Sequence, residues 1–405
     1  MTNLHRKRSL PKSSLKTDER LSSSCFLCAF SRAAITALLV FSVFLIPLGC
    51  DSATGGIFYH LENETETLDG SLDNNLSVTH IIKSGGTLYF SAGRVYEYTG
   101  DEWKDIDPPT KISGENATLL SSGVASLGDT LYASFYNEDG TKSGVYTYDS
   151  NSWNEISITG TNIDAESKII TINSVNGNIT VHYSYLNSED NRVFSAVYTS
   201  DGSSFYDVTL SSSNPIALGA PINDFAYHDS NYWLSAGNML YKGTYLENFS
   251  QDTTISTTAD IEALYADSDL SVLFAADSNG YVHTNDGSSW NKSNQVKSND
   301  VGVNFSSAIS FTGNNDNSLV CFGSKQQGYF EMSVSSSTDF TEAASITPKE
   351  PEIEELTSSS ENYKSTDLYN SGVKSFYYED GILYLGTASA GLWKNTISNR
   401  KWSRE

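Results

Sequence analysis

Short apolar runs, most of them preceded by a Gly, Asn or Asp turn, recur along most of the chain. Seven of them are rich in β-branched and aromatic residues, at 87–93, 130–135, 178–185, 231–237, 270–276, 318–324 and 382–388. Runs of this length, bounded by turn residues, are typical of β-strands. The pattern therefore predicts an all-β chain built from a repeated unit.

Each unit also contains aromatic residues at corresponding places. A second short run follows the first, and its key residues are Tyr96, Tyr146, Tyr198, Tyr241, His283, Phe330 and Trp393. A third aromatic closes each unit, at Trp103, Trp153, Phe205, Phe249, Trp290, Phe340 and Trp402. With a weaker strand before the first run, four short strands fill each repeat of roughly 40 to 50 residues, the period of propeller blades.

One four-stranded sheet cannot cover its own two faces, so it is marginal alone. Sheets set radially around an axis cover each other, and their aromatic columns become packing between blades. The sequence therefore predicts a seven-bladed β-propeller of four-stranded antiparallel blades. An eighth, split blade is the alternative.

Two hairpins have nearly the same sequence, TSDGSSF at 199–205 and TNDGSSW at 284–290. Asp-Gly favours a tight turn between two strands. These turns resemble the Asp-box of neuraminidase-type repeats, which implies that Asp201 and Asp286 form turns and are not reagents. The stretch ILYLGTASAGLWKN at 382–395 is similar to the repeat signature of regulator-type propellers. Both resemblances imply a fold and say little about activity.

The first 49 residues have the organisation of a secretory signal peptide, a cationic segment followed by the apolar run 33–49. The run is shorter than the roughly 20 residues of a spanning helix. Leu48, Gly49, Cys50 and Asp51 resemble the lipobox of bacterial lipoproteins, although Pro47 departs from it. This implies that Cys50 is acylated, for example with palmitate. An ordinary cleaved signal and an uncleaved anchor are the alternatives.

The predicted organisation is thus a signal peptide over 1–49, a lipidated tether over 50–55 and a propeller over 56–405. Residues 56 to about 66 repeat a Gly-apolar-aromatic pattern, so we expect them to supply an outer strand to the last blade. Cys25 and Cys28 fall in the leader, which leaves Cys321 as a buried apolar residue without a disulfide partner.

The net charge of −24 over 405 residues disfavours nucleic acid as a partner, because a strongly acidic surface repels phosphates. One acidic, Ser-rich stretch, 341–371, interrupts the repeat. It joins two blades on the face where propellers usually bind partners. Its residues Glu350, Glu352, Glu354 and Glu355 are the predicted interaction patch, and a merely solvated insertion is the alternative.

Sequence motifs for catalysis are lacking. No metal-ligand spacing of His, Gly-rich phosphate loop, G-x-S-x-G elbow or dinucleotide fingerprint occurs, so no catalytic, cofactor or metal residue is assigned. After the leader only Arg94, Arg192, Arg400 and Arg404 remain, too few to assemble the arginine triad that a sialidase uses.

The resulting hypothesis is an exported monomer, lipid-anchored to the bacterial cell membrane or outer membrane, that binds an envelope protein or glycan. The alternative is a polysaccharide hydrolase or lyase. That enzyme would need two acids on innermost strands, facing each other across the central funnel. A purely structural envelope protein is a third interpretation.

Overall fold

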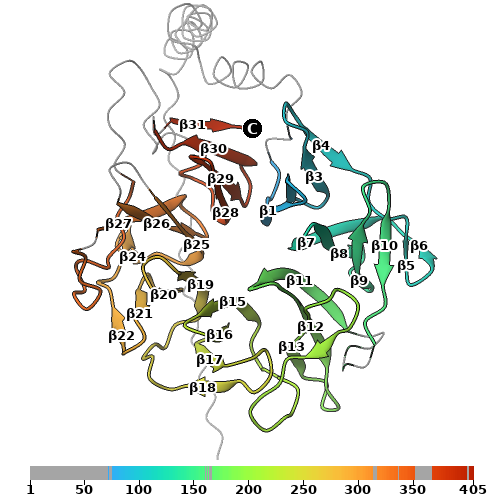
Figure 1. Ribbon diagram of the computed structural model, residues 1–405, viewed down its shortest axis with the longest axis horizontal. Helices are drawn as coiled ribbons and strands as arrows, with labels where there is room; N and C mark the ends of the chain where they lie inside the picture. The colour runs from blue at the N-terminus through green and yellow to red at the C-terminus, as the bar shows by residue number, and fades with distance from the viewer. Residues whose placement is uncertain are drawn as a thin grey trace, which may run out of the picture. The chain divides into compact units, whose positions relative to one another are not determined.

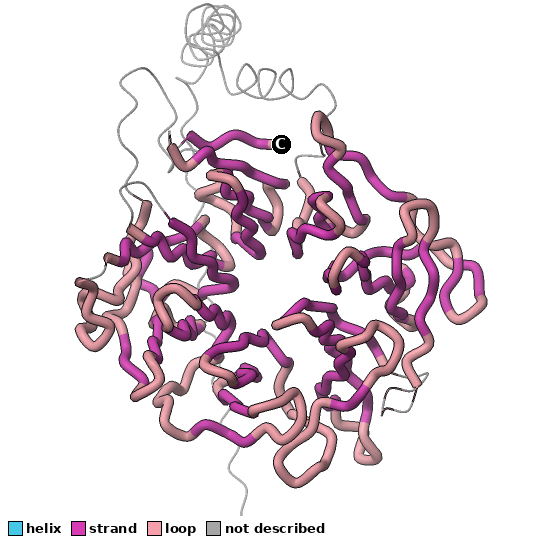
Figure 2. Tube along the Cα trace, in the orientation of Figure 1, coloured by secondary structure: helices cyan, strands magenta, loops and turns pink. Residues whose placement is uncertain are grey.

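The structure is a computed structural model that describes residues 72, 75–159, 161, 163, 167–312, 317–335, 337–351, 367–398 and 401–405. All regular elements of this part are β-strands, joined by turns and loops (Figure 2). The described residues accordingly hold no helix long and apolar enough to cross a membrane. Cys50 and the predicted outer strand over 56–66 lie outside the described residues.

The strands form seven antiparallel sheets around a central axis, with the first strand of each sheet innermost (Figure 1). Blade 1 is β1 (His80–Ser84), β2 (Thr87–Ser91), β3 (Val95–Tyr98) and β4 (Trp103–Ile106). Blade 2 is β7 (Leu119–Leu127), β8 (Thr130–Asn137), β9 (Ser143–Tyr148) and β10 (Trp153–Ile156). Blade 3 is β11 (Lys168–Val175), β12 (Asn178–Leu186), β13 (Arg192–Thr199) and β14 (Tyr206–Asp207).

The second half of the ring continues this order. Blade 4 is β15 (Ile222–His228), β16 (Asn231–Ala236), β17 (Met239–Gly243) and β18 (Ser250–Asp252). Blade 5 is β19 (Ile261–Asp267), β20 (Val272–Asp277), β21 (Val282–Asn285) and β22 (Trp290–Lys292). Blade 6 is β25 (Phe305–Thr312), β26 (Ser318–Ser324) and β27 (Tyr329–Val334), and blade 7 is β28 (Val373–Glu379), β29 (Ile382–Thr387), β30 (Leu392–Thr396) and β31 (Lys401–Arg404).

Blade 6 differs from the others at its outer edge. A single antiparallel bridge between Glu331 and Lys349 stands where the other blades have a fourth strand. Two small hairpins lie between blades, formed by β5 (Lys111–Ile112) with β6 (Glu115–Asn116) and by β23 (Lys297–Ser298) with β24 (Val301–Gly302). The predicted seven-bladed, all-β propeller is confirmed, with this reduction in one blade.

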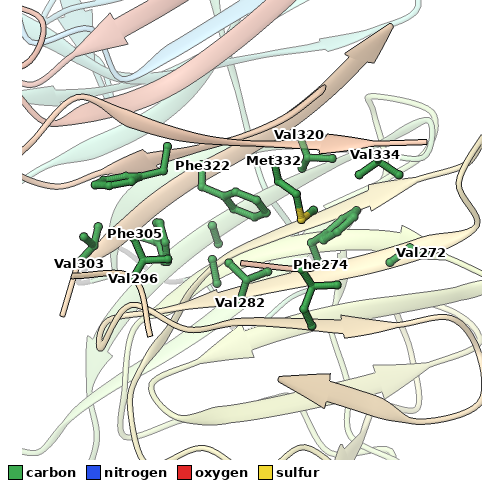
Figure 3. Close-up of a cluster of buried hydrophobic side chains, with 14 residues drawn as sticks. Val272, Phe274, Val282, Val296, Val303, Phe305, Val320, Phe322, Met332 and Val334 are labelled. Atoms are coloured by element: carbon green, nitrogen blue, oxygen red, sulfur yellow. The ribbon is translucent and has the colours of Figure 1, made fainter. Parts of the chain in front are cut away.

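A buried hydrophobic cluster lies at each of the seven interfaces between neighbouring blades. Between blades 5 and 6, for example, Phe274 packs against Phe322, which also contacts Phe305 (Figure 3). Tyr96, Tyr146 and Tyr198 all lie on the third strand of their blades, as the repeat predicts. Because each sheet buries its faces on its neighbours, the ring is stabilised as a whole and no blade has a core of its own.

The two similar hairpins are turns held by their aspartates. The carboxylate of Asp201 accepts hydrogen bonds from the backbone amides of Ser204 and Ser203, both at 2.8 Å. These bonds hold the pKa of Asp201 well below its usual range. Asp286 accepts from the Ser288 hydroxyl at 2.6 Å and from its amide at 3.0 Å. The predicted turn-forming role of both aspartates is consistent with these contacts.

The ring closes between blades 7 and 1. The Val78 amide donates to the Thr387 carbonyl at 2.8 Å, and the Trp103 indole N–H donates to a carboxylate oxygen of Glu405 at 3.1 Å. β31 fills the outer position of blade 7, so all four strands of that blade come from one stretch of chain.

Candidate interaction site

The predicted acidic patch is represented in the described residues by Glu350 alone, because Glu352, Glu354 and Glu355 lie outside them, as does Cys50. Glu350 is half-buried and directly follows Lys349, which pairs with β27 at the edge of blade 6. Ile346 and Leu368, near the two ends of the same stretch, are buried in the clusters on either side of blade 6. The acidic patch itself stays a prediction.

A ring of β-bulges marks the start of the innermost strands. In six of the seven blades the pairing of the first and second strands skips one residue near the start of the first strand. The skipped residues are Ser122, Ile170, Asn223, Glu262, Ser306 and Lys374. A bulge bends its strand and redirects side chains, and here it does so around the axis.

Four of these bulge residues connect their blade to the next one. The amide of Asn223 donates to the Ile261 carbonyl at 2.8 Å, and the Ser306 hydroxyl donates to the Val373 carbonyl. Glu262 forms an ion pair of 2.7 Å with Lys325 of blade 6. The ammonium of Lys374 donates to the Ser77 hydroxyl at 2.9 Å. Their polar groups thus hold the blades together at the axis.

The carboxylates of the innermost strands bear on the enzymatic alternative, a polysaccharide hydrolase or lyase. Asp224 is half-buried and accepts the amides of Phe225 at 2.8 Å and Leu264 at 2.9 Å, and desolvation of its carboxyl raises its pKa to about 7. Asp224 and Glu262 lie on adjacent blades and each has a structural partner. They are therefore not the pair facing each other across the funnel that the enzymatic alternative predicts.

The other two acids of these strands are engaged in the same way. Asp267 accepts the amides of Asp269 at 2.8 Å and Leu270 at 2.9 Å, and Glu379 pairs with Lys83 of blade 1. Within the described residues, no group of three His, Cys, Asp or Glu side chains could hold a metal ion. Each of the four carboxylates on the innermost strands thus has a structural partner.

Two histidines lie near the axis, His182 buried and His80 half-buried. Burial lowers the pKa of His80 to about 4 and that of His182 to about 3. His80 of blade 1 reaches Asn173 of blade 3 at 2.9 Å across Gly123 of blade 2. A Cβ at Gly123 would lie 2.8 Å from the Thr171 hydroxyl and 3.1 Å from the His80 ring, so a larger residue there would displace these side chains. His80 thus joins blades through hydrogen bonds, and the His182 ring packs against Phe225.

A groove of about 520 Å³ lies between blades 2 and 3. Its apolar lining comes from four isoleucines, and its polar lining includes Ser143 and Glu155; the isoleucines are Ile156, Ile158, Ile163 and Ile169. Since antiparallel strands alternate in direction, the end of β10 and the starts of β9 and β11 share one face. The stretch 341–371 connects to the start of β28 on that same face.

The groove is held open by polar contacts at its edges. The Ile169 amide donates to the Ser143 hydroxyl at 2.6 Å, which joins blade 3 to blade 2. The amide of Ser113, in the turn between β5 and β6, lies 3.0 Å from both carboxylate oxygens of Glu155. Ile170, the bulge residue next in the chain, is 40% exposed. An apolar side chain from another molecule would fit this environment.

Sequence analysis did not identify this groove. The signal was present around the connection from β10 to β11, where the strand ends and the connection together have five isoleucines between positions 156 and 170, two of them, Ile158 and Ile163, in the connection itself. A connection between blades is normally polar because it runs over the surface. The two isoleucines within this otherwise polar connection were therefore the available clue.

Comparisons with known proteins establish the fold and nothing finer. No family model matches the chain, and no curated protein matches it. Among solved structures, it is similar to YCF48 bound to D1 peptide, at 11% identity, with a TM-score of 0.52 over 80% of this chain and 93% of that chain. A streptogramin B lyase structure is similar at 12% identity, with a TM-score of 0.51 over 80% and 94% of the two chains. Both likenesses support the β-propeller fold.

Proposed function

We propose that this protein is a lipid-anchored, extracytoplasmic propeller that binds a protein partner through an apolar peptide segment seated in the isoleucine groove. The groove is the observation that carries the proposal. It combines an apolar lining with a polar rim, the usual composition of a recognition site. It also lies on the face formed by the connections between blades, where loops are free to make contacts.

Two further considerations support this proposal. Propellers are typically interaction modules, and one propeller of similar fold is YCF48 bound to D1 peptide. The chain has a net charge of −24, so a partner segment with basic residues around its apolar side chain would be favoured. The lipid anchor rests on the sequence around Cys50 and on the apolar run before it.

The binding proposal is tested by placing a charge in the groove. Ile158→Asp puts a carboxylate among the isoleucines, whereas Val301→Asp puts one on β24, where Val301 is 69% exposed. Cross-linking in the envelope captures the protein partners. We expect the wild type and Val301→Asp to capture the same partners, and Ile158→Asp to capture none of them. Equal capture by both variants, with unchanged thermal unfolding, would disprove the role of the groove.

The anchor is tested separately. Cells producing the wild type should incorporate labelled palmitate into the protein, and Cys50→Ser should abolish the label and release the protein from the membrane fraction. A labelled Cys50→Ser protein would contradict the anchor and leave the groove proposal intact.

A further inference from the structure

A second cavity, of about 320 Å³, lies between blades 4 and 5, away from the isoleucine groove. One wall is the hairpin 284–290, which contributes Asn285, Gly287 and Ser288, and the opposite wall is blade 4. The volume is at the lower end of the range for small-molecule sites, about 300–1,000 Å³. Apart from Trp233 and Gly287, every residue that lines it has a polar side chain.

Three charged residues line this cavity, Lys242, Asp229 and Asp252, and none of them has an ion-pair partner among the described residues. The carboxylate of Asp252 accepts the Thr254 amide at 2.7 Å and the Trp290 indole N–H at 3.2 Å, whereas Lys242 and Asp229 are less engaged. Lys242 places its ammonium 4.8 Å from the centre of the Trp233 ring, and Asp229 lies in the turn between β15 and β16. Both line the cavity, yet they form no ion pair with each other. His228 lies within electrostatic reach of both, and its pKa is lowered by burial. The charges of Lys242 and Asp229 are therefore available to a ligand.

The cavity also has hydrogen-bond donors without acceptors. The indole N–H of Trp233 is buried and has no partner in the described structure. Asn285, which is 9% exposed, accepts the Gly287 amide at 2.7 Å through its carbonyl oxygen, and its NH₂ group makes no hydrogen bond to described residues. His228 is 8% exposed and likewise has no side-chain hydrogen bond there. The NH₂ group of Asn285 and the ring of His228 are thus available to a ligand that accepts hydrogen bonds.

The aromatic residue of the cavity does not suit a sugar. A pyranose ring needs an open aromatic face to stack on, whereas Trp233 is only 3% exposed. One of its faces carries the Lys242 ammonium, and Trp290 makes an edge contact with it at 5.8 Å. The uncommitted charges are the stronger feature, and they call for a ligand that has a charge of each sign.

We propose that this cavity binds a free α-amino acid as its zwitterion. The ligand carboxylate would be bound by Lys242, with Asn285 as a further donor, and the ligand ammonium by Asp229. Such a ligand neutralises both uncommitted charges, and its small size fits the volume. The site is independent of the groove between blades 2 and 3, so either proposal can fail without the other.

Calorimetric titration of the full chain tests this proposal with defined probes. Glycine, L-alanine, L-leucine and L-glutamate are the zwitterions, and propionate and ethylamine each lack one of the two charges of alanine. We expect at least one of the four amino acids to bind, and L-alanine to bind at least about tenfold more tightly than propionate or ethylamine if it is among them. Lack of binding by all four at millimolar concentration, or equally tight binding of propionate, would overturn the proposal.

Matched variants locate the binding. Lys242→Met keeps the apolar stem over Trp233 without the charge, and Asp229→Asn keeps the shape and tolerates the φ of 47° at this position. Each substitution should weaken binding of the amino acid at least about tenfold. Lys292→Met is the control, because Lys292 also lies over an aromatic ring, Tyr281 at 3.6 Å, but outside the cavity. Equal loss in all three variants would contradict the assignment, provided that thermal unfolding shows them folded.

Discussion

The hairpins 199–205 and 284–290 are nearly identical in sequence, yet they meet different neighbours across the blade interface. At the first, the Tyr132 hydroxyl of blade 2 occupies the space beside Gly202, where a Cβ would lie 2.0 Å from it. At the second, only the Asp229 carboxylate comes near Gly287, at 3.9 Å from a Cβ. The first interface is filled, and the second leaves the cavity open.

The difference originates in the second strand of the preceding blade. Thr130 pairs with Leu127 in blade 2, and Asn231 pairs with His228 in blade 4, so Tyr132 and Trp233 occupy corresponding positions. Leu127 and Tyr132 fill the first interface, whereas His228 and Trp233 line the second. A repeated hairpin therefore conserves a turn, while the neighbouring blade decides whether it is packing or a site.

The largest effect should come from emptying the filled interface. Tyr132 is 4% exposed, so Tyr132→Ala removes a buried ring and leaves a cavity beside Gly202. We expect a loss of about 3 kcal/mol in the free energy of unfolding. Urea unfolding followed by tryptophan fluorescence measures it. A cost below about 1 kcal/mol, as for a surface substitution, would show that Tyr132 does not fill this interface.

A pair of glycine substitutions compares the two hairpins directly. Both glycines have positive φ, 74° at Gly202 and 92° at Gly287, so alanine strains each backbone. Only Gly202→Ala would also displace the buried Tyr132. We expect a cost of about 2 to 3 kcal/mol for Gly202→Ala and about 1 kcal/mol for Gly287→Ala, measured in the same unfolding experiment. Equal costs would mean that the space beside the two glycines is alike.

The smallest effect concerns pH. Burial lowers the pKa of His228 from its usual 6.5, so the unfolded chain takes up this proton first as the pH falls. The wild type should lose stability from this residue between pH 7 and pH 5. His228→Leu, which copies Leu127 at the filled interface, should show a smaller change in unfolding midpoint over the same interval. An unchanged pH dependence would show that His228 does not contribute.

The ring itself could be predicted from sequence because its signals are local. The strands, the Asp-Gly turns and the aromatic columns, such as Tyr96, Tyr146 and Tyr198, all repeat within single blades. Their period alone indicates sheets that must cover one another. The reduced edge of blade 6 was not predicted, since Phe340 continues the aromatic column there although only the bridge at Lys349 forms.

The sites were harder to predict because they depend on contacts between blades. Nothing near Gly202 or Gly287 in the sequence shows that Tyr132 meets one and Asp229 the other. The acidic run that includes Glu350 is visible in the sequence itself. Ile158 and Ile163, which line the groove, are isolated apolar residues in a loop and carry no such signal. Composition finds charge runs easily, and it does not find a cavity that two distant segments enclose.

The six bulges around the axis have a consequence for how this protein tolerates changes in length. A residue added to or removed from an inner strand would move Asn223 or Ser306 away from the carbonyl that each one binds on the following blade. It would also move the strand's side chains from one face of the sheet to the other. Insertions and deletions should thus be confined to the outer connections, so that divergent copies of this protein would keep a constant hub and vary at the periphery.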